Sequence, residues 1–379
     1  MATLIPPRMP STANGLFDSA IPAEEVARNR RRGRGSTENR SGRFEAFQRD
    51  LVDDGWETLA DLPALKTEVT LESPKRIITR NTSPDISFDR SINPYRGCEH
   101  GCAYCYARQT HAYMGLSAGL DFETKLFAKP DAARLLEQEL AEKGYAPRTI
   151  AMGTNTDPYQ PIERRYRITR AILEVLDRTS HPVGIVTKSA LVLRDLDILT
   201  RMAERGLVKV ALSITSLDNR LSRAMEPRAS APHRRLQALE TLSAAGVPTA
   251  VMVAPVVPGL NEAELDKILE RAASAGATEA GYILLRLPAE VREIFEAWLV
   301  EHYPDRAEKV LSLMRTMRGG KEYEAEWGLR MSGTGPHAWL IGRRFEQAAK
   351  RNRLNRRKLN LRTELFEKPV LTGGQYRLI

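Results

Sequence analysis

The sequence predicts an α/β protein whose parallel strands form a partial (β/α)6 barrel of the TIM type, with a basic extension at each end. Three observations predict this fold. Short apolar runs recur between residues 85 and 318, amphipathic helical patterns alternate with them, and nearly every apolar run ends in polar residues. Alternating strand and helix patterns are typical of a parallel sheet. Polar residues at many strand ends favour a barrel over an open doubly wound sheet, which concentrates its site at one switch point.

The predicted strands are short and almost continuously apolar, as strands buried on both faces should be. The first strand lies in the segment 85–98, which leads into a group of cysteines. The other five strands are predicted at residues 149–153, 183–187, 208–214, 249–256 and 280–287. No glycine-rich nucleotide-binding motif accompanies them, so a nucleotide-binding fold has no support in the sequence.

The predicted helices carry apolar residues at spacings of three and four, which gives each helix one face for the sheet. They cover residues 163–178, 195–205, 232–245 and 262–275. Asp195 and Asn261 stand where N-caps are expected. Four glycines stand where helices should end in a left-handed cap. These are Gly144, Gly206, Gly246 and Gly276.

The positive charge of the chain, a net +9, is concentrated near its two ends. Residues 28–43 contain seven Arg against the single acid Glu38, and residues 342–362 contain nine Lys or Arg against Glu346. Basic ends are the usual electrostatic footprint of a polyanion-binding protein, although solvated tails have the same composition. Arginine, rather than lysine, favours contact with phosphate.

Three regions follow from this pattern. We expect residues 1–70 to be a largely disordered basic extension, residues 71–320 to be the barrel, and residues 321–379 to be a basic helical extension. If the partner is a nucleic acid, the extensions should contact its backbone. The candidate contacts are Arg30, Arg31, Arg32, Arg343, Arg344, Arg356 and Arg357.

The cellular location is predicted from the apolar runs, the N-terminal pattern and the cysteine content of the sequence. It shows no run of about 18 apolar residues and no secretory signal pattern. Its three cysteines are too few and too closely spaced for a disulfide framework, which suggests a reducing compartment. We therefore expect a cytoplasmic protein that does not insert into a membrane.

Cys98, Cys102 and Cys105 are the only cysteines and follow the first predicted strand. Thiolates are soft ligands that suit zinc or an iron–sulfur cluster. A structural zinc site needs four ligands, and His100 or His111 could supply the fourth. A [4Fe–4S] cluster held by three thiolates leaves one iron open for chemistry. The spacing favours the cluster, with zinc as the alternative.

The pattern C-x3-C-x-aromatic-C, with Tyr104 in the aromatic position, resembles the signature of the radical S-adenosylmethionine (SAM) superfamily. Four stretches resemble its spore photoproduct lyase-like branch and, more closely, an uncharacterised bacterial family within that branch. They are SINPYRGCEHGCAYCYAR, DFETKLFAKPDAARLLEQEL, GTNTDPYQPIE and VTKSALVLRDLDIL. The resemblance covers about residues 80–320.

This resemblance implies a partial (β/α)6 barrel and a [4Fe–4S] cluster on the three cysteines. The amine and carboxylate of SAM would chelate the fourth iron. An electron from a reductant such as flavodoxin or ferredoxin would then cleave SAM to methionine and a 5′-deoxyadenosyl radical, which takes a hydrogen atom from the substrate. The protein would supply position and electrostatics for this chemistry.

Candidate SAM contacts come from the strand ends, read beside the family. Thr154, Asn155 and Asp157 follow the second strand and occupy the place of the family's amine-binding motif. Lys188 ends the third strand and would pair with the SAM carboxylate.

The remaining contacts would come from later strands and from the cysteine motif. Ser213 and Thr215 on the fourth strand would bond the carboxylate or the ribose hydroxyls. Pro258 and Gly259, after the fifth strand, occupy the adenine position and would act through backbone and shape. Tyr104 would help to seat the adenine.

One departure from the spore photoproduct lyase pattern matters. Those enzymes use an additional cysteine to return a hydrogen atom to the product radical, and this chain has no fourth cysteine. Tyr106 or Tyr159 would take that role, or the reaction differs, so photolesion repair by a lyase reaction is an analogy. Three functions stay open: a radical SAM enzyme acting in DNA repair or base modification, one with a small-molecule or protein substrate, and a non-enzymatic zinc or iron–sulfur protein that binds nucleic acid.

Overall fold

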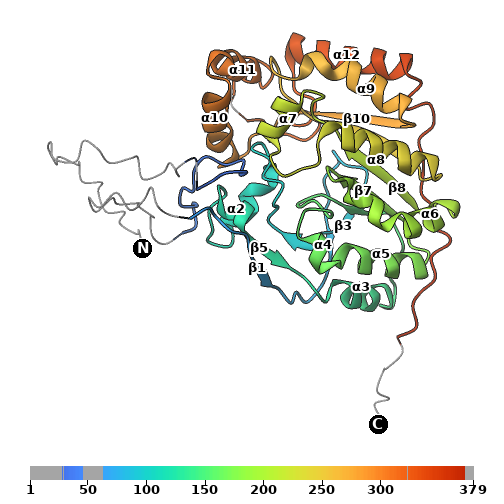
Figure 1. Ribbon diagram of the computed structural model, residues 1–379. Helices are drawn as coiled ribbons and strands as arrows, with labels where there is room; N and C mark the ends of the chain where they lie inside the picture. The colour runs from blue at the N-terminus through green and yellow to red at the C-terminus, as the bar shows by residue number, and fades with distance from the viewer. Residues whose placement is uncertain (1–27, 29, 46–62, 322, 372–379) are drawn as a thin grey trace, which may run out of the picture.

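The computed structural model describes residues 28, 30–45, 63–321 and 323–371, and a seven-stranded sheet lies at its centre (Figure 1). The strand order is β10-β9-β8-β7-β6-β3-β2, with β2 antiparallel to β3 and all other neighbours parallel. The strands are β2 Ile78–Arg80, β3 Arg90–Ile92, β6 Ile150–Met152, β7 Val183–Thr187, β8 Val208–Ser213, β9 Thr249–Val256 and β10 Glu279–Leu284. The six predicted parallel strands are confirmed. β10 and β2 stay apart as the two edges, so the described sheet is not a closed barrel.

Five helices between the strands bury their apolar faces in one continuous core with the sheet. They are α3 Ala132–Leu140, α5 Ile168–Arg178, α6 Leu196–Glu204, α8 Pro232–Ala244 and α9 Leu265–Ser274. The helix predicted at 163–178 is interrupted, because Arg167 takes a left-handed φ of 52° between α4 (Glu163–Tyr166) and α5. The other predicted helices occupy the predicted positions.

The predicted helix ends are confirmed at the glycines and differ at the N-caps. Gly144, Gly206, Gly246 and Gly276 have φ angles of 82°, 69°, 79° and 93°. The Asp195 side chain makes no cap hydrogen bond, because its carboxylate pairs with Arg170 and Arg194. Asn261 instead donates to the carbonyls of Thr215 and Pro255, which ties together the ends of β8 and β9.

A second group of elements lies outside the seven-stranded sheet, and α2, α7, α10 and α11 among them pack around the loop that carries the cysteines. A three-stranded sheet has the order β1-β5-β4. The elements are β1 Glu68–Leu71, β4 Tyr95–Arg96, β5 Lys125–Ala128, η2 Tyr106–Arg108, α1 Gln109–Ala112, α2 Asp121–Thr124, η3 Ala190–Asp195, α7 Asn219–Met225, η4 Glu262–Glu264, α10 Val291–His302 and α11 Pro304–Thr316. A second apolar cluster joins Cys102, Ala103 and Tyr104 to Trp298 on α10 and Val310 on α11.

The described part of the N-terminal extension is ordered against the body of the protein, unlike the disorder expected for residues 1–70. Residues 34–38 are buried. Gly35 N and Ser36 N donate to the Glu123 carboxylate at 2.9 and 2.8 Å. This buried acid needs donors, and the segment supplies them. Residues 1–27, 29 and 46–62 lie outside the described part, so the expectation there has no structural counterpart.

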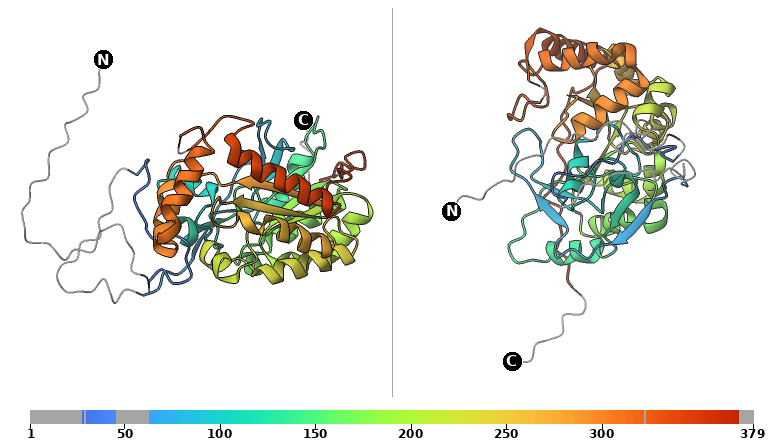
Figure 2. Two further views of the ribbon diagram at one scale, coloured as in Figure 1. Left: turned by 90° about the horizontal axis from the view of Figure 1, so that it is seen from above. Right: turned by 90° about the vertical axis from the view of Figure 1, so that its left-hand side faces the viewer.

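The C-terminal region contains the predicted helix, α12 (Gly335–Arg351), which lies beside α9 and β10 (Figure 2). The chain then crosses the amino-terminal edge of the sheet. Backbone hydrogen bonds run from Asn355 N, Arg362 N and Glu367 N to the carbonyls of residues that precede β10, β8 and β7. These acceptors are Thr278, Gly206 and Thr179. Among the described helices, none combines the length and apolarity needed to cross a membrane.

Candidate functional site

The three cysteines lie on one short loop after the carboxyl end of β3, and the loop turns twice within residues 98–105. Backbone hydrogen bonds from Gly101 N to Cys98 O (3.3 Å) and from Cys105 N to Cys102 O (3.2 Å) close the two turns. The side chains of Cys98 and Cys102 are buried and that of Cys105 is half-buried. The three thiols therefore lie on one short loop, near enough for the charges of Cys102 and Cys105 to act on Cys98.

The surroundings of the thiols favour their neutral form until a cation binds. Burial raises the pKa of Cys102 to about 12 and also raises the pKa of Cys105. At Cys98 burial is the main cause of a raised pKa, and the charges of Asp157 and Cys102 add to it. A metal centre reverses this balance, since a coordinating thiol is deprotonated outright.

An ion pair between Arg108 and Glu123, with both side chains 0% exposed, supports the loop. Arg108 Nε donates to the Cys102 carbonyl at 2.9 Å, and Arg108 Nη1 donates to the carbonyls of Ala118 and Gly119. A buried ion pair is stable only when its remaining hydrogen-bonding groups are satisfied, and here they are. No local pattern in the sequence indicates this pair.

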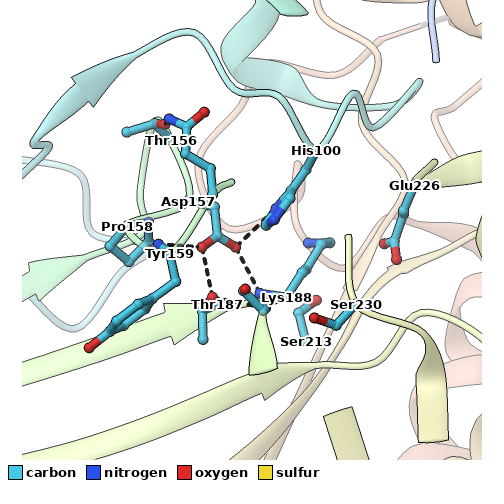
Figure 3. A network of polar contacts seen from close by, with 12 residues as sticks. His100, Thr156, Asp157, Pro158, Tyr159, Thr187, Lys188, Ser213, Glu226 and Ser230 are labelled. Atoms are coloured by element: carbon cyan, nitrogen blue, oxygen red, sulfur yellow. Dashed lines mark hydrogen bonds and ion pairs between the residues drawn. The ribbon is translucent and has the colours of Figure 1, made fainter. Parts of the chain in front are cut away.

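Asp157 lies in the loop after β6 and has hydrogen-bond or ion-pair partners on both carboxylate oxygens (Figure 3). It accepts from Thr187 Oγ1 (2.7 Å), Lys188 N (2.7 Å) and Tyr159 N (2.9 Å), and His100 Nδ1 lies 3.4 Å away. Burial alone would raise the pKa of Asp157, but His100, Thr187 and Lys188 N lower it to about 2. Asp157 therefore joins the ends of β6 and β7 to the cysteine loop, and its oxygens are not directed solely at a ligand.

The predicted residues at the ends of β7 and β8 gather on the same side as the cysteines. Lys188 Nζ lies 5.8 Å from the centre of the Tyr104 ring. Burial lowers the pKa of Lys188, but the charges of Cys102 and Glu226 outweigh burial and raise it. Ser213 is buried and donates to the Ala254 carbonyl at 3.2 Å. Lys188 therefore lies near the cysteine loop, and its predicted contact with the SAM carboxylate stays a prediction.

The loop after β6 leaves polar groups at the surface of the site. Asn155 is exposed, and Asn93 Oδ1 accepts from Asn155 N (3.0 Å) and from Thr154 Oγ1 (3.1 Å). After β9, Pro258 is buried and Gly259 takes a φ of 72°. A Cβ on Gly259 would meet side chains of α11, with the nearest atom at 3.3 Å. The Cα of Gly259 therefore packs against that helix.

The two candidate hydrogen-return tyrosines differ in placement. Tyr106 directly follows Cys105, is 40% exposed and donates from its hydroxyl to the Thr154 carbonyl. The Arg286 guanidinium lies over its ring at 5.4 Å. Tyr159 is 0% exposed within the main core, and in Figure 3 its hydroxyl points away from the network around Asp157. This placement gives Tyr159 a packing role and keeps Tyr106 as the candidate.

A buried carboxylate beside the cysteine motif was missed from the sequence. Glu226 accepts from the Tyr104 hydroxyl, from Thr215 Oγ1 (2.6 Å) and from Arg235. Burial would raise the pKa of Glu226, but Arg235 and Lys188 lower it. Glu226 lies in the segment MEPR, where no local pattern indicates a buried carboxylate.

The predicted basic contacts are in part neutralised within the chain. Arg31 pairs with Glu301 (2.8 Å), Arg344 with Asp266 (2.8 Å) and Arg343 with Glu346 (2.7 Å). Arg32, Arg356 and Arg357 are exposed, and Arg30 is half-buried. Three of the seven predicted contacts therefore lie in ion pairs with carboxylates of this chain.

A pocket of about 430 Å³ lies between the N-terminal segment, α7 and α10. Its lining residues are Arg28, Arg31, Arg32, Gly33, Arg34, Arg220, Ala224, Glu301, His302 and Tyr303. Five arginines stand there against one glutamate, so the pocket is positively charged. It adjoins the cysteine loop, because Ala224 precedes Met225, whose carbonyl accepts from Ala103 N at 3.1 Å.

Comparisons with known proteins identify the family. Residues 92–272 match the model of the radical SAM superfamily. An uncharacterised protein of Mycobacterium tuberculosis is 38% identical over 232 residues, which are 61% of this chain and 68% of that protein. The chain belongs to the radical SAM superfamily. An uncharacterised protein of Methanocaldococcus jannaschii is 29% identical over 52% of this chain and 71% of its own length.

The fold is similar to that of spore photoproduct lyase, solved with bound AdoMet and a dinucleoside spore photoproduct. The TM-score is 0.53 at 17% identity, covering 75% of this chain and 78% of that one. The radical SAM assignment makes this chain an enzyme whose cofactors are a [4Fe–4S] cluster and SAM. The prediction of the family, the fold and the cofactors is confirmed.

The residues present fit such a cluster better than a zinc ion. His111 Nε2 is engaged with the Lys125 carbonyl at 2.9 Å, and its ring packs edge-on to Phe122. Within the described ranges, no three His, Cys, Asp or Glu side chains are placed to hold one metal ion. A [4Fe–4S] cluster takes one thiolate on each iron, so three thiols leave one iron for SAM. These contacts do not support the zinc alternative.

Proposed function

We propose that this radical SAM enzyme acts on a nucleic acid, in a base-modification or photolesion-repair reaction. When bound, the cluster and SAM supply one-electron cleavage of a sulfonium C–S bond and the hydrogen abstraction that follows. The observation that carries the proposal is the grouping of the Cys98, Cys102 and Cys105 thiols with Lys188 at the carboxyl edge of the sheet, next to an arginine-rich pocket.

The chain's own residues would bind and orient SAM. Lys188 pairs with the carboxylate, because its ammonium lies close enough to Cys102 for the two charges to interact. Thr154 and Asn155 present polar groups to the amine from the loop after β6. Asp157 acts on Lys188 through the backbone, since it accepts from Lys188 N. Thr215 and Tyr104 meet at Glu226 beside them.

Hydrogen return is assigned to Tyr106. It is the half-exposed tyrosine that follows the last cysteine of the motif. Its hydroxyl reaches the loop after β6, and its ring lies under Arg286 at the end of β10. Tyr106 therefore lies between the loop after β6 and Arg286, with part of its side chain exposed to an approaching substrate.

The nucleic-acid substrate is supported by charge. The pocket places five arginines around one glutamate, and guanidinium groups match the geometry of phosphate oxygens. Contacts of this kind bind the backbone of any sequence and weaken steeply with salt. The similarity in fold to a lyase solved with a dinucleoside ligand agrees with this choice.

The test is anaerobic reconstitution with iron and sulfide, followed by dithionite, SAM and an assay for 5′-deoxyadenosine. We expect 5′-deoxyadenosine from the wild type and none from Cys102→Ala. A second assay titrates a fluorescent oligonucleotide at several salt concentrations. The logarithm of the binding constant should fall linearly with the logarithm of the salt concentration. SAM cleavage without any oligonucleotide binding would favour the alternative of a small-molecule or protein substrate.

A further inference from the structure

Four consecutive residues at the end of α7, Met225–Arg228, contact the cysteine loop from another part of the chain. Met225 O accepts from Ala103 N at 3.1 Å, and Arg228 N donates to His100 O at 3.3 Å. Arg228 Nη1 also lies 3.4 Å from Glu99 Oε1. We call this segment the 225–228 clamp.

Glu226 is the centre of the clamp and is 0% exposed through its side chain. One of its oxygens accepts from Thr215 Oγ1 and the Tyr104 hydroxyl, and the other accepts from Arg235. A carboxylate is buried at this depth only when it is paired and hydrogen-bonded. The position of Glu226 is therefore set by Thr215, two residues after β8, and by Arg235 on α8.

Tyr104 connects Glu226 to the loop that carries the thiols. Its backbone lies between Cys102 and Cys105, and its hydroxyl is held by Glu226. The same tyrosine ring faces Lys188 Nζ at 5.8 Å. A shift of Glu226 would therefore move both the Cys102–Cys105 turn and Lys188, the residue proposed to bind SAM.

We infer that Glu226 is a positioning residue for the iron–sulfur centre: through the Tyr104 hydroxyl it sets the orientation of the Cys102–Cys105 turn relative to Lys188. The inference does not depend on the substrate of the enzyme. It depends on the clamp contacts and on the three cysteines that hold the cluster.

A second buried triad provides a matched control. Glu163 is also 0% exposed and accepts from the Tyr95 hydroxyl and from Arg194 (2.7 Å), which repeats the Tyr–Glu–Arg arrangement of Glu226. None of its hydrogen bonds reaches residues 98–105. Glu163→Gln therefore removes a comparable buried charge without touching the cysteine loop.

The experiment compares Glu226→Gln, Tyr104→Phe and Glu163→Gln after anaerobic reconstitution of the full chain. Iron per chain, the midpoint potential of the cluster and the electron paramagnetic resonance spectrum before and after SAM are measured, with thermal unfolding as the record of stability. Glu226→Gln should lose at least half of the spectral change caused by SAM and shift the potential. Glu163→Gln should keep both at wild-type values, even where its unfolding temperature falls.

Tyr104→Phe keeps the fold testable, because it removes only the hydroxyl and leaves Glu226 paired with Arg235. Tyr104→Phe should lose as much of the SAM-induced spectral change as Glu226→Gln does. The double variant should lose no more than either single variant. Wild-type spectra and potential in Tyr104→Phe would overturn the inference. An equal loss of the SAM-induced spectral change in Glu226→Gln and Glu163→Gln would also overturn it.

Discussion

Gly35 of the N-terminal segment packs directly on the backbone carbonyl of Gly101, between the first two cysteines, so closely that a Cβ on Gly35 would overlap that oxygen. Gly35 N also donates to the Glu123 carboxylate that pairs with Arg108 beneath the loop. The basic N-terminal segment is thus part of the structure that shapes the cysteine loop.

Gly35→Ala should displace this segment from the loop. The backbone atoms of Gly101 cannot move aside as a flexible side chain would, so we expect a loss of about 1–3 kcal/mol in the free energy of unfolding. Iron per chain after reconstitution should fall with it. Gly33→Ala is the control, because a Cβ there meets nothing within 4 Å and adds only the strain of a φ of 74°. A Gly35→Ala protein as stable and as iron-rich as wild type would show that the contact is dispensable.

Asp157→Asn tests whether this carboxylate acts on the fold or directly on SAM. The amide would present a donor to at least one of the groups that now donate to Asp157, namely Thr187 Oγ1, Lys188 N and Tyr159 N. Leaving a buried donor unsatisfied costs about 1–3 kcal/mol, so urea unfolding should show that loss. SAM affinity, measured by equilibrium dialysis, should fall through the displacement of Lys188.

Thr187→Val is the comparison for Asp157→Asn, because it removes one of the donors and leaves the charge. Its loss of stability should be smaller. If Asp157→Asn is as stable as wild type and yet fails to bind SAM, the carboxylate contacts the SAM amine directly, as the sequence had predicted.

His181 should make stability depend on pH. It is 0% exposed, shares a hydrogen bond with the Tyr145 hydroxyl (2.9 Å) and packs against Phe366 of the C-terminal segment. Burial lowers the pKa of His181 to about 4, so the native state favours the neutral ring. Its stabilising contribution is complete above about pH 6.5 and is lost as pH falls toward 4. Between pH 7 and pH 5 the loss is about 2 kcal/mol.

Denaturant unfolding of the wild type and His181→Gln at both pH values measures this contribution. The variant is less stable at pH 7, and its stability should fall less between pH 7 and pH 5. Burial also lowers the pKa of His111 to about 4, so a residual pH dependence is expected in the variant. Parallel pH profiles for the two proteins would contradict the assignment to His181.

The sequence was sufficient for elements that are encoded locally. Continuous apolar runs gave the parallel strands, and glycines such as Gly206 marked helix ends, because each signal lies within a few residues. Glu226 was missed because its partner Tyr104 is 122 residues away, and no local pattern records that pairing. The composition of residues 34–38 predicted disorder, yet Glu123, about 88 residues further on, draws the segment into the interior. The environment of Glu226 and of residues 34–38 is therefore set by partners that are distant in the sequence and that only folding brings into contact.

Arg220→Glu tests the pocket as a phosphate-binding surface. Arg220 is exposed on α7 at the pocket wall, so the substitution changes the local charge by two without disturbing the core. Oligonucleotide affinity should fall about tenfold near physiological salt, and the slope of log affinity against log salt should fall by about one. The loss should be similar for unrelated oligonucleotide sequences, because a phosphate contact carries no sequence information. Arg134→Glu on α3 makes the same charge change at another exposed arginine and should leave binding near wild type. Equal losses in the two variants would mean that net charge, rather than this pocket, governs binding.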